Sequence, residues 1–322
     1  SPIMIVITFL IVFIVAAIYR IYTRRNFDES KFELVKDKKL YKTMISYSGW
    51  NLFGSIAGVA KGQGVNVVLN MFFGPTVNAA RGIAIQVQSA VQGFVSNFQM
   101  AVKPQIIKSF AAGDKDYMTS LIIKSSKFSF YLIFILSLPI ILEIDQILKL
   151  WLKTVPEYTN IFTILILIVI LIDSMSDSLM TGVQATGKIK LYQAVVGSLQ
   201  IAILPISFIF LNYGYSPEIT LFVNIVISII ALIVRLIFIN KLIGFPISFF
   251  FKDVIFNNIL VVALSFVIPY LIKMKMDANT LRIFTIAFIS IIWSLSIVYI
   301  VGLNKSEKRS VVKLIKFMIL NK

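Results

Sequence analysis

One apolar stretch of the chain, residues 77–102, carries polar side chains at spacings that suit a helix. They follow one another at intervals of 7, 4, 4 and 3 residues: Arg81, Gln88, Gln92, Ser96 and Gln99. Because an α-helix turns by about 100° per residue, these side chains form a single stripe along its length. Such a stripe predicts a helix that lines a water-filled cavity. The alternative is a polar seam between two packed helices.

The preceding stretch, residues 44–73, combines polar side chains with small ones. One broad face holds Asn51, Ser55, Gly62, Asn66 and Asn70, with Lys61 and Gln63 at its edges. Gly54, Gly58 and Gly62 lie four residues apart and form a ridge on which another helix can pack closely. In apolar surroundings the ammonium group of Lys61 needs water, a carboxylate or an anionic ligand. This predicts a cavity, with an internal ion pair as the alternative.

Two carboxylates lie one helical turn apart within residues 159–185. Asp173, Asp177 and Gln184 share one face of the expected helix. Two carboxylates at this spacing repel each other when both are charged, so the pair favours binding of a proton or a sodium ion, as in transporters. The alternative is that one of them pairs with Lys61 or another cation.

The chain contains no cysteine and no histidine. This excludes disulfides, thiolate nucleophiles, histidine bases and the usual zinc ligand sets. Tyrosines and carboxylates are present, but none forms a nucleophile–base pair at a recognisable spacing. We therefore expect a protein that is not an enzyme, with no catalytic residue, no metal site and no cofactor.

Composition indicates where these polar residues are placed. Of 322 residues, 58% are hydrophobic and only 14% are charged, whereas soluble domains are about half apolar and about a quarter charged. The apolar residues fall in blocks long enough to cross about 30 Å of hydrocarbon as helices. The net charge of +16 fits basic cytoplasmic loops better than a nucleic-acid partner. The sequence predicts an all-α integral membrane protein.

We expect about nine transmembrane helices of roughly twenty or more residues each. They cover residues 3–22, 44–73, 77–102, 121–142, 159–185, 190–212, 217–240, 253–272 and 281–303. The sequence Gly74-Pro75-Thr76 predicts a turn between the second and third spans. Arg81 then lies near the outer end of its span, where reaching out to the membrane surface is an alternative to lining a cavity.

Basic residues in the connections set the predicted orientation. One side of the membrane receives 24 of the 31 lysines and arginines, among them Lys127 and Arg235, and the other side receives 6. Lys61 lies inside a span. By the positive-inside rule the richer side is cytoplasmic. The C-terminus and the connector 23–43 are therefore expected in the cytoplasm, and the first residue outside.

Two polar segments are expected at the cytoplasmic surface. The connector 23–43 mixes both charges with apolar residues and predicts an interfacial amphipathic helix at a domain boundary. The tail 304–322 predicts a second amphipathic helix. The chain starts with Ser1 and enters an apolar span almost at once, without the usual form of a signal peptide. We expect it to be a fragment that begins in or just before a helix of a longer protein.

The residues from Ser46 to Asp114 carry a family resemblance. They read SYSGWNLFGSIAGVAKGQGVNVVLNMFFGPTVNAARGIAIQVQSAVQGFVSNFQMAVKPQIIKSFAAGD. This stretch resembles bacterial polysaccharide-export flippases, which move lipid-linked oligosaccharides and share a superfamily with the multidrug and toxin extrusion transporters. The runs ILKLWL at 147–152, PEY at 156–158 and QATGK at 184–188 are also similar to this family.

The resemblance implies a division of the chain. Family members have two lobes of six helices around a central cavity, often with two added C-terminal helices. On that pattern 1–22 is the last helix of the first lobe, 23–43 the connector, 44–240 the second lobe, 241–303 the added pair and 304–322 the tail. The first five helices of the family pattern are absent, so a cavity formed between lobes would be incomplete in this chain.

The resemblance also implies a function in the bacterial cytoplasmic (inner) membrane. The expected substrate is a polyprenyl-pyrophosphate-linked oligosaccharide for O-antigen, lipopolysaccharide or capsule synthesis, moved to the outer leaflet by alternating access. Lys61 and Arg81 would meet the pyrophosphate. The amides expected to line the cavity and bind sugar are Gln63, Asn66, Asn70, Gln88, Gln92 and Gln99. Asp173 and Asp177 would couple H⁺ or Na⁺. Polysaccharide assembly proteins are further expected partners.

Three other functions compete with a flippase. A multidrug or cation antiporter of the same superfamily needs an aromatic and acidic cavity, whereas this chain places basic and amide side chains in its spans. A membrane polysaccharide polymerase or glycosyltransferase usually has large external loops, and the expected external connections here are short. A non-transporting assembly protein has no need of a polar stripe along the whole of 77–102.

Overall fold

The computed structural model describes residues 2–30 and 35–320, without the side chains of residues 2, 29, 310 and 314–320. Within those ranges every regular element is a helix, and no strand occurs. The chain forms two compact units, residues 1–45 and 46–322.

Eight helical segments among the described residues are long and apolar enough to cross a membrane. They are Ile3–Asn26, Lys38–Ala111, Lys115–Trp151, Thr159–Ala185, Lys190–Asn212, Ile219–Ile243, Ile247–Lys275 and Thr280–Gly302. Helices of this length and composition span the hydrocarbon core of a bilayer. The prediction of an all-α, multi-pass membrane protein is therefore confirmed.

The first unit holds one complete helix and the start of a second. α1 (Pro2–Asn26) is followed by the 3₁₀ turn η1 (Asp28–Ser30), and α2 (Lys38–Val59) begins before the unit ends. The connector 23–43, predicted as one interfacial helix, is divided differently. α1 contains its first residues, α2 contains its last, and a short turn lies between them. Residues 31–34 of this prediction lie outside the described part of the chain.

A side-chain cap sets the start of α2. Oδ1 of Asp37 accepts hydrogen bonds from the backbone N–H groups of Lys39, at 2.8 Å, and Leu40, at 3.2 Å. An aspartate at this position satisfies N–H groups that have no partner inside the helix. The helix therefore begins within the polar connector.

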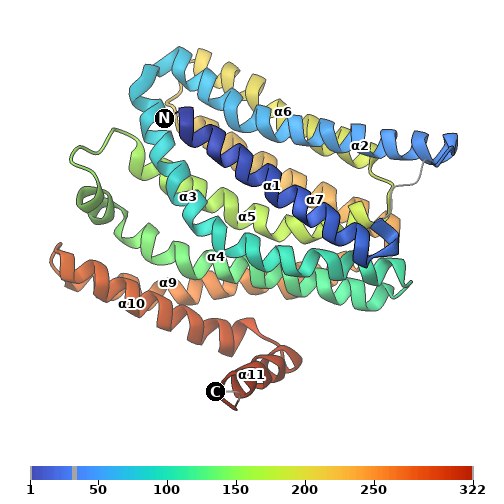
Figure 1. Ribbon diagram of the computed structural model, residues 1–322. Coiled ribbons are helices and arrows are strands. Elements are labelled where there is room, and N and C mark those ends of the chain that lie inside the picture. Colours follow the sequence, from blue (N-terminus) through green and yellow to red (C-terminus); the bar gives the residue numbers. More distant parts are fainter. Residues whose placement is uncertain (1, 31–34, 321–322) are drawn as a thin grey trace. The chain divides into compact units, whose positions relative to one another are not determined.

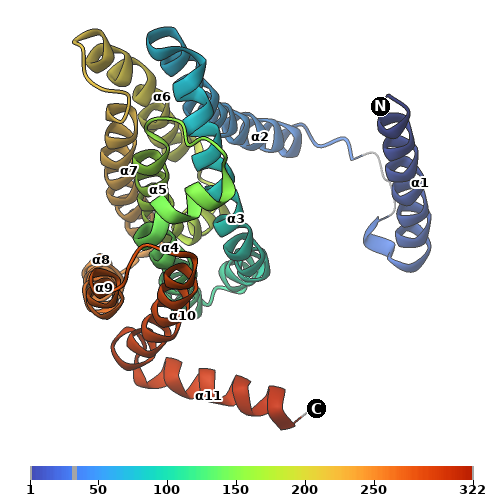
Figure 2. The ribbon, with the colours of Figure 1, turned by 90° about the vertical axis from the view of Figure 1, so that its left-hand side faces the viewer.

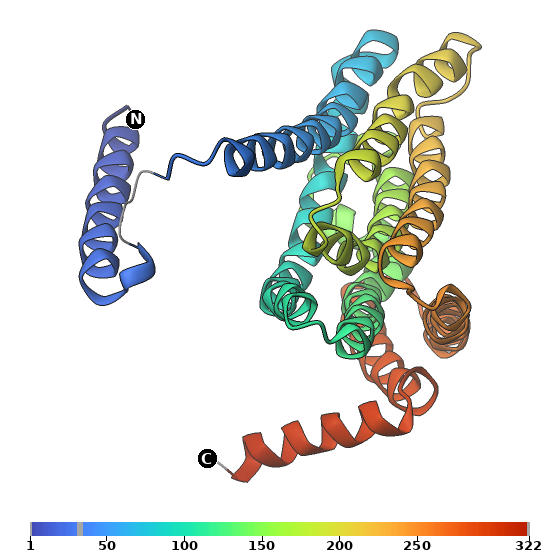
Figure 3. The same ribbon diagram turned by 90° about the vertical axis from the view of Figure 1, so that its right-hand side faces the viewer.

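In the second unit α2 continues through the π-helical turn η2 (Ala60–Gly64) into α3 (Val65–Ala111). The helical stretch from Lys38 to Ala111 has 74 residues and would be about 110 Å long if straight, several times the thickness of the hydrocarbon core. It breaks at Gly74, whose φ of 74° and ψ of −168° are essentially restricted to glycine. The turn predicted at 74–76 is confirmed, and the chain folds back in this region (Figures 1 and 3).

The central helix of the second unit is α5 (Thr159–Ala185). It packs against α3, α4 (Lys115–Trp151) and α7 (Ile219–Ile243), and Figure 2 shows it between α3 and α7. α6 (Lys190–Asn212) packs on α7 and on η2. Because other helices enclose α5, its polar side chains face protein or internal space. This position allows Asp173 and Asp177 to take part in a site.

The remaining helices lie beside α4. They are α8 (Ile247–Phe250), the π turn η3 (Phe251–Phe256), α9 (Asn257–Lys275), α10 (Thr280–Ile297), the π turn η4 (Val298–Gly302) and α11 (Lys305–Leu320). α9 and α10 pack on each other and on α4 (Figure 1). The helix predicted for the C-terminal tail is present as α11, which leaves the end of α10 (Figure 3).

Candidate functional site

Most of the candidate site residues line one cavity, named cavity 1 here. Its volume is about 330 Å³, and its walls come from α2, η2, α3, α5 and α7. Its polar lining residues are Lys61, Gln63, Asn66, Arg81, Gln88, Asp173 and Asn224. Side chains from four separate expected spans thus meet at one place.

The π-helical turn η2 carries Lys61 and Gln63 into cavity 1. A π turn holds an extra residue and occurs frequently at functional sites. The carbonyl of Gly62 in this turn accepts a hydrogen bond from Nη1 of Arg81 at 3.2 Å. A Cβ added at Gly62 would meet no atom within 4 Å. Gly62 therefore borders open space instead of packing against another helix.

Arg81 is enclosed by protein. Only 6% of its surface is exposed, so the alternative in which it reaches out to the membrane surface does not hold. Nη1 also donates to the side-chain oxygen of Asn66. Nε is buried and has no hydrogen-bond partner among the described residues. A buried guanidinium donor without a partner is unfavourable, so a ligand oxygen in cavity 1 would stabilise it.

Lys61 forms an ion pair with Asp173. The distance from Nζ to Oδ2 is 3.4 Å, and the two side chains are 20% and 34% exposed. The sequence left two alternatives for Lys61, a cavity and an internal ion pair. Both apply, because Lys61 lines cavity 1 and is also paired with Asp173. Cavity 1 contains the cations Lys61 and Arg81 and the anion Asp173. Its formal charge is +1.

Asp177 lies one turn further along α5 and does not line cavity 1. It accepts a hydrogen bond from Gln99, and the positive charges of Lys103 and Arg235 act on it. The negative charge of Asp173 also acts on it. The two carboxylates predicted as a pair thus have different neighbours: one faces a cavity and a lysine, and the other faces α3 and α7.

The polar stripe of α3 divides along its length. Gln88 lines cavity 1, and its Nε2 donates to Oε1 of Gln92 at 3.3 Å. Gln99 is 7% exposed and donates to Oγ of Ser129 on α4 at 3.3 Å. Gln92 does not line cavity 1, and neither does Asn70, which precedes Gly74 in the chain. Both side chains are exposed. The stripe is thus a cavity wall near Arg81 and a polar seam near Gln99.

The glycine ridge of α2 faces α6 over part of its length. A Cβ at Gly54 would lie 2.3 Å from Oε1 of Gln193, and one at Gly58 would lie 3.8 Å from Oε1 of Gln200. Gly64 approaches Leu204 of the same helix, at 2.6 Å from an added Cβ. The packing function predicted for this ridge therefore applies to its first two glycines, and Gly64 extends it.

No family model, curated protein or solved structure matches this chain. Its function must be argued from the residues and their geometry.

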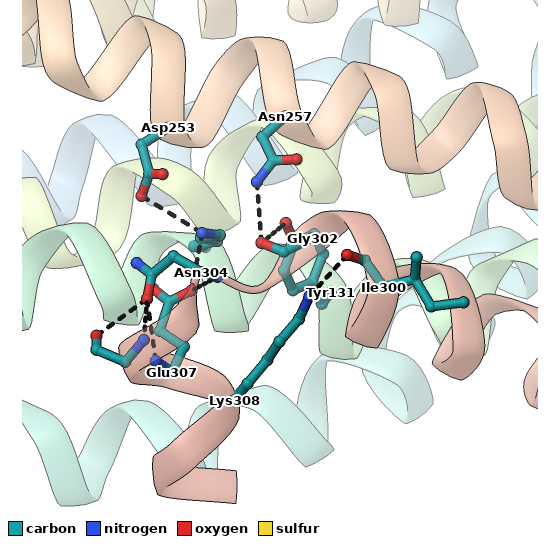
Figure 4. Close-up of polar contacts among 10 residues, drawn as sticks. Tyr131, Asp253, Asn257, Ile300, Gly302, Asn304, Glu307 and Lys308 are labelled. Atoms are coloured by element: carbon teal, nitrogen blue, oxygen red, sulfur yellow. Dashed lines mark hydrogen bonds and ion pairs between the residues drawn. The ribbon is translucent and has the colours of Figure 1, made fainter.

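The burial of one lysine outside cavity 1 was not predicted from the sequence. Lys127 was placed among the basic residues of the cytoplasmic connections, but its side chain is 0% exposed within α4. Its Nζ lies 3.3 Å from Oδ2 of Asp253 and 3.0 Å from Oε2 of Glu307. Figure 4 shows the side chains of Asp253 and Glu307 converging from different helices. The signal that sequence reasoning overlooked is the presence of acidic residues near both ends of the C-terminal helix pair.

Glu307 also takes part in the N-terminal cap of α11. Its Oε2 also accepts a hydrogen bond from the backbone N–H of Asn304 at 2.8 Å, while Oδ1 of Asn304 accepts from the N–H of Glu307 at 3.0 Å. This reciprocal arrangement is a capping box, which satisfies N–H groups at a helix start. One carboxylate oxygen therefore both starts α11 and binds Lys127.

A second ion pair joins α4 to α10 further along α4. Glu143, whose side chain is 1% exposed, accepts hydrogen bonds from Nε of Arg282 at 3.2 Å and from Nη2 at 3.0 Å. Nζ of Lys273 donates to the carbonyl of Leu142. α4 has a non-helical residue at Glu143, with φ −114° and ψ 22°. The kink and the ion pair occur at the same residue.

Proposed function

We propose that this chain forms one wall of a flippase that moves a polyprenyl-pyrophosphate-linked oligosaccharide across the bacterial cytoplasmic membrane. The observation that carries the proposal is cavity 1, which combines Lys61 and Arg81 with the amides of Gln63, Asn66 and Gln88 inside a bundle of apolar helices. Cations suit a pyrophosphate, and amides both donate to and accept from sugar hydroxyls. A lipid-linked sugar offers both kinds of group.

The proposed architecture follows the family pattern. The break at Gly74 divides Lys38–Ala111 into two crossings, which brings the proposed number of spans to nine. Residues 1–22 end the first lobe, 44–240 form the second lobe, and 241–303 form an added pair. The connector 23–43, the tail 304–322 and the C-terminus are proposed to lie in the cytoplasm, as the distribution of basic residues favours.

The ion pair in cavity 1 supports a binding mechanism. Lys61 and Asp173 are 3.4 Å apart, line cavity 1 and are both partly exposed. A pyrophosphate in the cavity can therefore reach Lys61 and replace Asp173 as its partner. Arg81 would bind the same group through its unpartnered Nε. The glycan would then contact the amides while the polyprenyl chain stays in lipid, and rocking of the lobes would change the open side.

The competing cation antiporter is less well supported. Asp173 is the single carboxylate among the described residues that line cavity 1, and it is paired with Lys61. An antiporter for organic cations needs negative charge that is free to bind the substrate. The positive charge of cavity 1 favours an anionic substrate.

The proposal is tested by export of polysaccharide in cells that depend on this gene. Lys61→Ala and Arg81→Ala are expected to reduce surface polysaccharide strongly, because each removes a cation from the pyrophosphate position. Lys241→Ala is the matched control, since Lys241 is exposed at the end of α7. Protein level in the membrane is measured for every variant.

Arg81→Lys is added because Arg81→Ala leaves polar groups of Asn66 and Gly62 without their donor. Arg81→Lys keeps the charge and is expected to retain part of the export. Lys61→Gln is added as a second, polar replacement that removes the charge of Lys61. Normal export in both alanine variants, at normal protein level, would rule out the proposed role of cavity 1.

A further inference from the structure

A second cavity, named cavity 2, lies between α2, α5, α6 and α7. Its volume is about 230 Å³, and it shares no lining residue with cavity 1. Its polar lining residues include Asn51, Ser55, Gln184, Gln193, Gln200 and Arg235. Ligand pockets for drug-sized molecules usually hold about 300–1,000 Å³. Cavity 2 therefore suits a small ion or the head group of a larger molecule.

Arg235 faces cavity 2 with an incomplete set of partners. The side chain comes from the interior of α7 and is 7% exposed. Its Nε donates to Oη of Tyr192 at 3.3 Å. Its Nη1 is buried and has no hydrogen-bond partner among the described residues. Since a buried charged donor without an acceptor is unfavourable, this nitrogen points to an acceptor that the protein itself does not supply.

The charge of cavity 2 indicates the sign of that acceptor. Arg235 is the single charged side chain among the described residues that line it. Asp177 is the carboxylate on which Arg235 acts electrostatically, yet the two form no ion pair within the described part of the chain. The cavity is therefore positive, and amides of α5 and α6 surround the guanidinium.

Nearby amides add donors for an anion. Gln184 of α5 and Gln200 of α6 both line the cavity, and Gln193 is held by a hydrogen bond to Oδ1 of Asn51 at 3.2 Å. An amide nitrogen donates two hydrogen bonds. The planar guanidinium group suits the oxygens of phosphate groups, which it binds through two parallel hydrogen bonds.

We infer that cavity 2 is a binding site for a phosphate-type oxyanion, with Arg235 as the cationic ligand. The site is separate from cavity 1, and it does not require that the chain transport anything. Sequence reasoning placed Arg235 among the basic residues of the cytoplasmic connections, whereas the structure places it inside the bundle.

The test is isothermal titration of the purified full chain in detergent, with two probes in separate arms. Inorganic pyrophosphate represents a free anion, and farnesyl pyrophosphate represents a lipid head group. Arg235→Gln is expected to weaken binding about 10- to 100-fold, as for loss of a charged hydrogen bond. Lys241→Gln, an exposed change at the end of the same helix, is expected to leave the Kd unchanged. All titrations use the Lys61→Ala/Arg81→Ala background as well, which removes the cations of cavity 1.

Each outcome decides the inference. Arginine-dependent binding of inorganic pyrophosphate supports a free anion, and binding of farnesyl pyrophosphate alone supports a lipid head group. If neither probe binds, or if Arg235→Gln binds like the unchanged protein, the inference is overturned. If Arg235→Gln does not fold, Arg235→Met takes its place, because it also removes the charge, and an unchanged Kd for this variant overturns the inference. Normal polysaccharide export by the cavity 1 variants would contradict the transport proposal and leave the anion site in cavity 2 unaffected. Failure of one proposal can therefore be distinguished from failure of the other.

Discussion

Asp173 and Asp177 occupy the same face of α5 but have different surroundings. Asp173 lines cavity 1 and contacts Lys61, whereas Asp177 accepts from Gln99 and lies in the field of Arg235. A substrate anion that binds Lys61 would release Asp173 from its ion pair. The freed carboxylate would then be available to a proton or a sodium ion, so substrate binding and ion binding would be linked at one residue.

This linkage gives the first prediction. Asp173→Asn combined with Asp177→Asn should abolish any dependence of transport on a proton or sodium gradient, because no carboxylate then remains on this face of α5. Asp173→Asn alone should have most of the effect, since Asp177 does not line cavity 1. The measurement is flux of a lipid-linked oligosaccharide in proteoliposomes under imposed gradients.

Glu157→Gln serves as the control, because Glu157 is exposed and precedes α5. A gradient dependence that persists unchanged in the double variant would remove both aspartates from coupling.

Single residues also show how far the sequence could predict the site. Lys61, Arg81 and Gln88 were found from their residue types and helical spacing, and the structure brings them together. The burial of Arg235 and Lys127 was not predicted, because counting basic residues along the chain says nothing about which face of a helix they occupy. Only the packing of α7 and α4 against other helices turns these two side chains inward.

At the scale of elements, two local departures from α-helical geometry organise the path from α2 to α3. Gly74 reverses the chain, and η2 inserts a π turn (Ala60–Gly64) before that reversal. One extra residue rotates everything after it by about 100° relative to an unbroken helix. Asn51 and Ser55 line cavity 2, whereas Gly58 and Gln63 line cavity 1, so the change from one cavity to the other begins in the last turn of α2, before η2.

The division between the two cavities shows what periodicity could not predict. A uniform helical wheel over 44–73 placed Asn51, Asn66 and Asn70 on one face. In the structure the first two belong to different cavities and Asn70 is exposed. By contrast, the turn near Gly74 was predictable, because glycine followed by proline has a strong local preference that does not depend on packing.

Substitution of glycine by alanine at two sites of α3 should have opposite effects. Gly74→Ala should lower stability by about 1–3 kcal/mol, because the conformation at this residue is essentially restricted to glycine. Gly82→Ala should raise stability by about 0.5–1 kcal/mol, since Gly82 is helical and alanine favours helices. An added Cβ meets no atom within 4 Å at either site.

Thermal unfolding of the two purified variants in the same detergent provides the measurement. Because both changes add one methyl group without a clash, the difference reports backbone conformation alone. If the two substitutions change Tm by the same amount in the same direction, an alanine side chain at position 74 causes no backbone strain.

For the whole molecule, α4 is the helix to which the C-terminal helices of the second unit are attached. Lys127 binds Asp253 and Glu307, and Glu143 binds Arg282. The two attachment points are 16 residues apart on α4, about 24 Å along its axis. Ion pairs at two separated positions restrict rotation of the C-terminal helices about α4, so this part should move together with the lobe in any rocking motion.

Removal of the buried cation should test this attachment. Lys127→Met leaves Asp253 and Glu307 without their cation, and breaking a buried pair costs about 3–5 kcal/mol. We expect a clear fall in Tm, together with faster proteolysis after α10. Lys124→Met is the control, because Lys124 lies one turn earlier on α4 and is partly exposed. Equal Tm values for the two variants would contradict a stabilising function of the cluster.

The burial of Lys127 also has a consequence for synthesis of the chain at the ribosome. Its two partners are encoded 126 and 180 residues later. At about 5–20 residues per second, Lys127 is synthesised roughly 9–36 s before both carboxylates exist. During that interval an uncompensated ammonium group must stay in contact with water or with the insertion machinery. Final placement of α4 in the bilayer therefore has to wait for the last helices, and a ribosome that stops near residue 240 leaves α4 without its counter-charges.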